Sequence, residues 1–175
     1  MASLQTLLGT AMIAALVSAP ARADVLDTPA ERHLMLPSAP VELTIPRGDW
    51  VITREQRRTG DTAVYYALTS EQRGMILSVF IDKTGTCQSA QACRDASTKN
   101  PSYKDAKDLK SLGIGNFSVS QFFLDQPQGL ALKQANLLAS AYVQGYWFDV
   151  HISKAGPERP DPTLLVDLLK EIAIK

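Results

Sequence analysis

Short apolar segments with strand-like alternation dominate the chain between residues 41 and 81. In the first of them, Val41, Leu43 and Ile45 alternate with polar residues, which is typical of a strand with one buried face. Turn signals separate it from the segments that follow, which are 50–53, 63–68 and 75–81. The last segment is apolar on both faces, so we predict that it lies in the interior of a sheet.

Two longer runs on either side of Gln144-Gly145 predict a tight β-hairpin. If Val143 pairs with Tyr146, one face of the hairpin is wholly apolar. That face consists of Leu137, Ala139, Ala141, Val143, Tyr146, Phe148, Val150 and Ile152. The opposite face carries the cross-strand pairs Asn136/Ser153, Leu138/His151, Ser140/Asp149 and Tyr142/Trp147. A shift of one residue would mix the two faces, and the pattern therefore predicts this register.

Helical signals are found in three places. The residues between the two cysteines are helix-prone, and the segment from Asn100 to Leu112 has the spacing of a short amphipathic helix that Gly113 ends. At the C-terminus, Asp161 and Pro162 mark the start of a helix with one apolar stripe, formed by Leu164, Leu165, Leu168, Leu169 and Ile172. A further strand is predicted at 117–124, and no repeat or linker divides the chain.

The N-terminus has the pattern of a secretory signal peptide at residues 1–23. An apolar stretch over 7–17 is followed by Pro20 and by a small-x-small sequence, so we expect cleavage after Ala23 and a periplasmic location. Residues 24–40 contain three prolines and predict an irregular lead-in to a single α+β domain at 41–175. No apolar run is long enough to cross a bilayer, which takes roughly 20 residues.

Cys87 and Cys93 are the only cysteines, and export would place them in an oxidising compartment. Two residues six apart within one helix lie about 9 Å apart along its axis, whereas the Cα atoms of a disulfide lie at most roughly 7 Å apart. A disulfide therefore requires Cys87 to precede the helix, with Ser89 as the N-cap. Because the chain has no C-x-x-C motif and no histidine nearby, we predict a structural bond.

The composition excludes several classes of protein. An apolar share of 45% is that of a globular protein and excludes wholesale disorder. With 18 basic and 18 acidic side chains the net charge is zero, which argues against a protein that binds nucleic acid.

Three stretches together carry a family resemblance: the strand that enters 45–50, the hairpin at 142–153 and the Leu-rich helix that ends in 172–174. They resemble the PsbP/Mog1-like group, to which small exported bacterial DcrB-like proteins also look similar. The resemblance implies an α+β fold with a single antiparallel β-sheet and helices packed on its faces. Members of the group serve as binding, assembly or accessory proteins, so the resemblance implies no catalytic residues.

The polar face of the hairpin carries three side chains of the types found in catalytic triads. Asp149, His151 and Ser153 share that face, but residues two apart on a strand are about 6.6 Å apart, beyond the contacts of roughly 2.6–3.2 Å that a catalytic relay needs. No nucleophile motif supports such a relay. We therefore predict no catalytic, cofactor-binding or metal site.

The candidate contact surface consists of Tyr142, Trp147, Asp149 and His151, since aromatic rings beside hydrogen-bonding groups are typical of interfaces and ligand pockets. The alternative is that a covering element buries these aromatics as a second core layer. From these observations we expect a non-enzymatic accessory, assembly or immunity-type protein that binds another envelope protein. The alternative function is binding of a small molecule or lipid between sheet and helices, and an enzyme with an unrecognised site is a third hypothesis.

Overall fold

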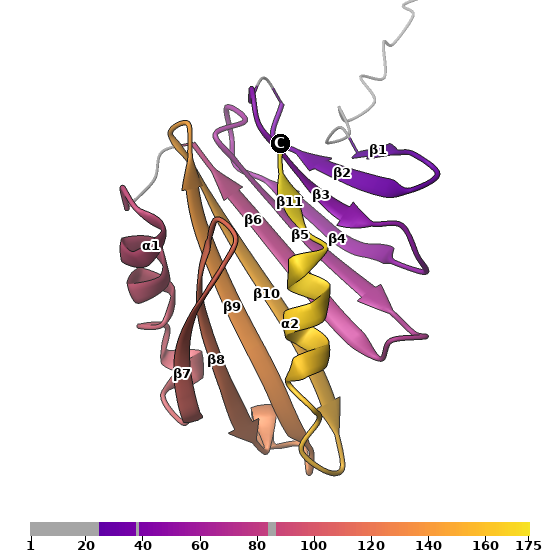
Figure 1. The fold of residues 1–175 in the computed structure, drawn as a ribbon, viewed down its shortest axis with the longest axis vertical. Helices are drawn as coiled ribbons and strands as arrows, with labels where there is room; N and C mark the ends of the chain where they lie inside the picture. The colour runs from indigo at the N-terminus through magenta and orange to yellow at the C-terminus, as the bar shows by residue number, and fades with distance from the viewer. Residues whose placement is uncertain (1–24, 38, 84–86) are drawn as a thin grey trace, which may run out of the picture.

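The computed structural model describes residues 25–37, 39–83 and 87–175, and within these ranges the chain forms two antiparallel sheets (Figure 1). The larger sheet has the strand order β4-β5-β6-β10-β9-β8-β7, with bounds Val51–Arg57, Ala63–Ser70, Met75–Asp82, Tyr146–Gly156, Lys133–Val143, Phe117–Asp125 and Lys107–Ile114. The smaller sheet has the order β1-β2-β3-β11, with bounds Val25–Asp27, Glu31–Met35, Glu42–Pro46 and Ala173–Ile174. The helical elements are α1 and α2 and the 3-10 turns η1 and η2, with bounds Ala90–Ser97, Thr163–Lys170, Pro101–Tyr103 and Pro127–Gly129.

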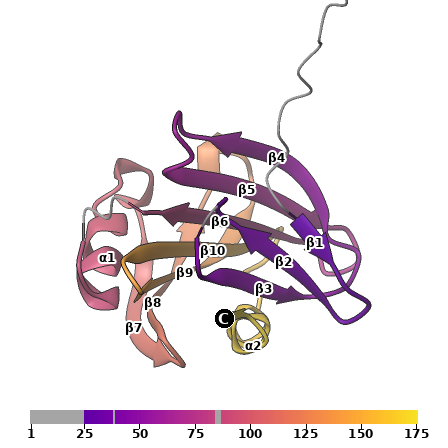
Figure 2. The same cartoon turned by 90° about the horizontal axis from the view of Figure 1, so that it is seen from above.

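The fold is mostly β, so the predicted single antiparallel sheet with helices packed on its faces is wrong. One face of the seven-stranded sheet is covered by the four-stranded sheet together with α2, as Figure 2 shows. The opposite face, which we call the outer face, carries α1 against β8, β9 and β10. A second sheet therefore covers the face for which helices were predicted.

The hairpin of β9 and β10 has the predicted register. Val143 pairs with Tyr146, and the pairing continues through Trp147 with Tyr142 and Asp149 with Ser140 to the end of both strands. Gln144 and Gly145 both have positive φ, at 50° and 85°, as a type I′ turn requires. The segment 75–81 forms β6 and lies between β5 and β10, which confirms its interior position in the sheet.

The core lies between the two sheets and α2. The apolar face of the hairpin is buried there, together with Val64, Tyr66 and Leu68 of β5. Tyr66 is fully buried, and its hydroxyl donates to the carbonyl of Met35 at 2.8 Å, so its polar atom is paired. From α2, Leu165, Leu168 and Leu169 join the core, but Leu164 is 46% exposed and does not belong to the buried stripe.

The N-terminal lead-in is not irregular throughout its described residues. Residues 25–27 and 31–35 form β1 and β2; β1 pairs with β2, and β2 pairs with β3. Arg32 of β2 donates to the carboxylate of Asp27 at 2.7 Å and to the carbonyl of Trp50 at 2.7 Å. Such short strands are stabilised by pairing with neighbouring strands and not by a pattern in their own sequence. The prolines of the segment therefore predicted an irregular loop. The signal-peptide segment 1–23 lies outside the described residues.

The predicted helix between Asn100 and Leu112 is wrong. Only η1 forms there, and the chain then enters β7, an edge strand whose residues 107–113 are exposed. Leu109 and Leu112 are 58% and 37% exposed, so they form no buried helical stripe. Pairing with β8 outweighs the local helical spacing, because backbone hydrogen bonds to a neighbouring strand are available at that edge.

The predicted disulfide is confirmed. Cys87 precedes α1, Cys93 lies within it, and their Cα atoms are 5.0 Å apart. Ser89 is the N-cap, and its hydroxyl accepts from the backbone N–H of Ala92 at 3.1 Å. Among the described residues no helix is long and apolar enough to cross a membrane.

Replacing both Cys87 and Cys93 with Ser should lower the free energy of unfolding by about 2 kcal/mol, because the unfolded chain regains the freedom of a short loop. The measurement is urea unfolding of the variant beside the wild type under non-reducing conditions. The intact mass of the wild type should show two hydrogens fewer than the reduced chain. An unchanged midpoint of unfolding would show that the bond does not stabilise the fold.

Candidate functional site

The four residues of the predicted contact surface all lie on the outer face, as the register requires. Tyr142 and Trp147 are half-buried, and the Trp147 ring meets Phe80 edge-on with ring centres 5.6 Å apart. Asp149 and His151 lie further along β10, under α1 and η1. The alternative, that a covering element buries this surface, therefore applies to Asp149 and His151, which α1 and η1 cover. Trp147 stays partly exposed.

A cleft of about 500 Å³ separates the end of α1 and η1 from the strands β9 and β10. We call it the aspartate cleft, and its lining includes Ser97, Lys99, Tyr103, Leu138, Trp147 and Asp149. Two of the four predicted surface residues, Trp147 and Asp149, thus line one cavity. The sequence pattern missed Ser97 and Tyr103, because they come from elements whose position over the sheet is not encoded locally.

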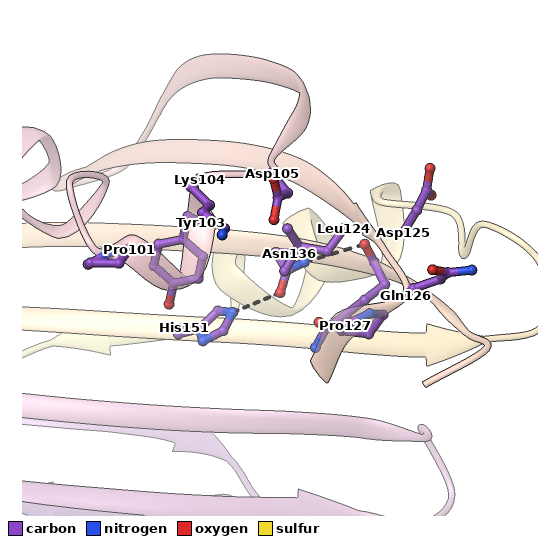
Figure 3. Close-up of a pocket in the computed structure, with 11 residues that line it drawn as sticks. Pro101, Tyr103, Lys104, Asp105, Leu124, Asp125, Gln126, Pro127, Asn136 and His151 are labelled. Atoms are coloured by element: carbon purple, nitrogen blue, oxygen red, sulfur yellow. Dashed lines mark hydrogen bonds between the residues drawn. The ribbon is translucent and has the colours of Figure 1, made fainter. Parts of the chain in front are cut away.

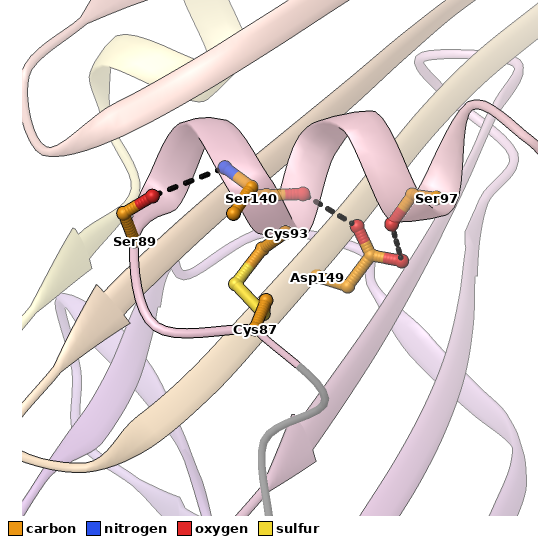
Figure 4. Close-up of a disulfide and its surroundings, with 7 residues drawn as sticks. Cys87, Ser89, Cys93, Ser97, Ser140 and Asp149 are labelled. Atoms are coloured by element: carbon orange, nitrogen blue, oxygen red, sulfur yellow. Dashed lines mark hydrogen bonds between the residues drawn. A yellow bond between two sulfur atoms is a disulfide. The ribbon is translucent and has the colours of Figure 1, made fainter.

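Asp149 is the acidic group of this cleft. Its Oδ1 accepts from Ser140 at 3.2 Å and its Oδ2 accepts from Ser97 at 3.2 Å (Figure 4). Burial raises the pKa of Asp149 to about 6, against the two hydroxyl hydrogen bonds, which lower it. The Ser97 contact also ties the last turn of α1 to β10.

His151 belongs to a neighbouring cleft of about 450 Å³, which we call the histidine cleft. Figure 3 shows Tyr103, Asn136 and His151 gathered at this cavity. Asn136 donates through Nδ2 to the carbonyl of Gln134 at 3.3 Å, so its Oδ1 accepts from Nε2 of His151 at 3.0 Å. Burial lowers the pKa of His151 to about 4, and the imidazole is therefore neutral at pH 7.

Tyr103 stands between the two clefts and lines both. Its ring packs edge-on against Phe122 and against the imidazole of His151, with centre distances of 5.1 and 5.9 Å. Burial raises the pKa of its phenol, and the nearby negative charge of Asp149 adds to this.

The three side chains that share the strand face are not linked to one another by these contacts. Asp149 bonds to Ser97 and Ser140, whereas His151 bonds to Asn136. Ser153 is buried at 4% exposure. In the described part of the chain no group of three or more His, Cys, Asp or Glu side chains is arranged to hold a metal ion.

The outer face also carries an apolar surface that the sequence pattern missed. Tyr65 of β5 pairs with Phe80 of β6, and Phe80 pairs with Asp149 of β10. Tyr65, Phe80 and Trp147 are half-buried, and Ile76 on the same face of β6 is 51% exposed. We call Tyr65, Phe80 and Trp147, together with Ile76, the aromatic patch. Ile76 lies four residues before Phe80 on β6, with Ser78 between them on the same face. The even spacing of Ile76 and Phe80 indicated that they share one face of the strand. The apolar run of β6, however, predicted burial of both faces, and so the partly exposed face was missed.

Comparison of the chain with protein-family models and with curated proteins finds no match. The resemblance to the PsbP/Mog1-like group therefore stays a prediction.

Proposed function

We propose that this protein is a non-enzymatic, exported accessory or assembly factor that binds another protein of the cell envelope through the aromatic patch. The observation that carries the proposal is the position of the patch on the outer face of β5, β6 and β10, with Ile76 51% exposed, whereas the contacts of α1 on this face are with β8, β9 and β10. Clusters of partly exposed aromatic and aliphatic side chains are typical of protein interfaces, because their burial in a complex removes apolar area from water.

Export is part of this proposal and has one support in the described chain. The disulfide of Cys87 and Cys93 is compatible with an oxidising compartment. The signal-peptide pattern at 1–23 and cleavage after Ala23 remain predictions from the sequence. A periplasmic location follows from them.

The test is site-specific photo-crosslinking in cells of the native host. A photoreactive amino acid at position 78, between Ile76 and Phe80 on β6, should capture one envelope protein. The same amino acid at position 164 on α2, far from the patch, should not capture it. Crosslinking from both positions alike, or from neither, would overturn the proposal.

Ile76→Asp and Leu164→Asp are a matched pair of variants for the same experiment. Both replace an exposed aliphatic side chain, at 51% and 46% exposure, so both should fold. Ile76→Asp should reduce the crosslink from position 78 by about tenfold, since a charge is placed inside an apolar interface. Leu164→Asp should leave it unchanged, and equal effects of the two variants would contradict the assignment of the patch.

The second candidate function is the binding of a small molecule. It is favoured by the two adjoining clefts, whose lining combines aromatic rings with buried polar groups.

A further inference from the structure

The Asp149 carboxylate has unused capacity to accept hydrogen bonds. Each of its oxygens accepts one serine hydroxyl, whereas an ionised carboxylate offers about four acceptor positions. Among the described residues no Lys, Arg or His nitrogen is within 4 Å of it, although 11 ion pairs of Lys or Arg with a carboxylate occur elsewhere in the described chain. Buried carboxylates are usually paired with a positive charge. The Asp149 carboxylate has no such cationic partner among the described residues.

Aromatic rings adjoin the carboxylate in the same cavity. Tyr103 from η1 and Trp147 from β10 both line the aspartate cleft with Asp149, and Phe80 packs edge-on against Trp147. The faces of aromatic rings carry a negative potential that attracts cations, most strongly for Trp. The cleft of about 500 Å³ thus combines a carboxylate with aromatic surfaces at a size that fits a small organic cation.

We propose that the aspartate cleft binds an organic cation, an alkylammonium or guanidinium group, paired with Asp149 and held against Trp147 and Tyr103. The cation is either a free small molecule or a basic side chain presented by a protein partner. The inference stands on the cleft itself and does not depend on a partner at the aromatic patch.

Lys99 is the one cationic side chain in the lining of this cleft within the described residues. It is exposed. A positive charge in the lining would repel a cation bound at Asp149. Lys99→Ala should therefore tighten cation binding severalfold. Substitutions of Asp149 or Tyr103 should have the opposite effect and weaken it.

The experiment is a titration of the oxidised protein followed by NMR of the two indole N–H signals. Trp147 reports on the cleft, while Trp50 is buried in the core at 4% exposure and serves as the internal reference. The probes are tetramethylammonium, N-acetyl-lysine methylamide and N-acetyl-arginine methylamide. Tert-butanol, which is neutral and of similar shape to tetramethylammonium, is the control probe.

We expect at least one cation to shift the Trp147 signal with a dissociation constant on the order of 1 mM, and tert-butanol to have no effect. Asp149→Asn and Tyr103→Leu should each weaken binding by about tenfold, whereas Tyr103→Phe should retain it because the ring remains. Tighter binding of the amino-acid derivatives would identify a basic side chain as the source, and tighter binding of tetramethylammonium a free organic cation.

Three results would overturn the inference. They are equal shifts with tert-butanol, unchanged affinity of Asp149→Asn, or no response to any cation up to roughly 0.1 M. Ile76→Asp separates this inference from the proposed function. It should leave cation binding intact while it removes the crosslink at position 78, so either proposal can fail without the other.

Discussion

Asp149→Asn should change the pH dependence of the free energy of unfolding: relative to the wild type, the variant should be more stable at pH 7 than at pH 4 by about 2 kcal/mol. Burial raises the pKa of Asp149 from 3.8 to about 6 in the folded state. The folded protein therefore binds the proton more tightly than the unfolded chain, and this group makes the wild type more stable as the pH falls from 6 to 4. The amide of the variant cannot ionise. The variant therefore lacks the increase in the free energy of unfolding that the wild type shows at low pH, and it also lacks the destabilisation caused by a buried charge at pH 7.

His151→Gln should show a change of similar size and opposite sign. The pKa of His151 falls from 6.5 to about 4 on folding, so the unfolded chain binds its proton more tightly. This group makes the wild type less stable as the pH falls from 6.5 to 4. The variant loses that dependence and should gain about 3 kcal/mol relative to the wild type at pH 4 compared with pH 7.

The two effects oppose each other within the same pH window, so they offset one another in the wild type. The measurement is urea unfolding of the wild type and both variants at several pH values from 4 to 7. Asp105→Asn makes the same chemical change at an exposed position and is the control. Parallel pH profiles for the wild type and the two variants would show that neither side chain titrates as its burial requires.

Gly145→Val should lower the free energy of unfolding by on the order of 2 kcal/mol or more. Gly145 has φ of 85°, a conformation that a β-branched residue adopts only under strain. It forms the turn of the hairpin whose strands, β9 and β10, lie at the centre of the larger sheet. The variant must either hold the strained turn or change the loop, and a change of loop endangers the register.

Gly113→Val is the matched control for this substitution. A Cβ at either glycine would meet nothing within 4 Å, so crowding does not distinguish the two sites. Gly113 lies in the exposed edge strand β7 and lacks the positive φ of Gly145. Thermal unfolding should therefore show little change for Gly113→Val and a clear loss for Gly145→Val. Equal melting temperatures of the two variants would contradict the role assigned to the turn.

The sequence by itself determined the features that depend on contacts between neighbours along the chain. The hairpin register followed from the alternation around Gln144-Gly145, because only one pairing separates the apolar face from the polar one. The position of Cys87 ahead of the helix, and Ser89 as its cap, followed from helix geometry and the reach of a disulfide. The predicted residues Tyr142, Trp147, Asp149 and His151 therefore share the outer face as expected.

Only the tertiary structure decided the features that depend on long-range pairing. The short strands β1 and β11 carry little pattern of their own, and they form a second sheet because β2 and β3 offer them unpaired backbone groups. Residues 107–114 have helical spacing, yet they form β7 because β8 presents an open edge. In the same way, α1 and η1 place Ser97 and Tyr103 beside Asp149, which is more than 40 residues away in sequence. The candidate site arises from these packing contacts, and no local sequence pattern specifies which side chains they bring together.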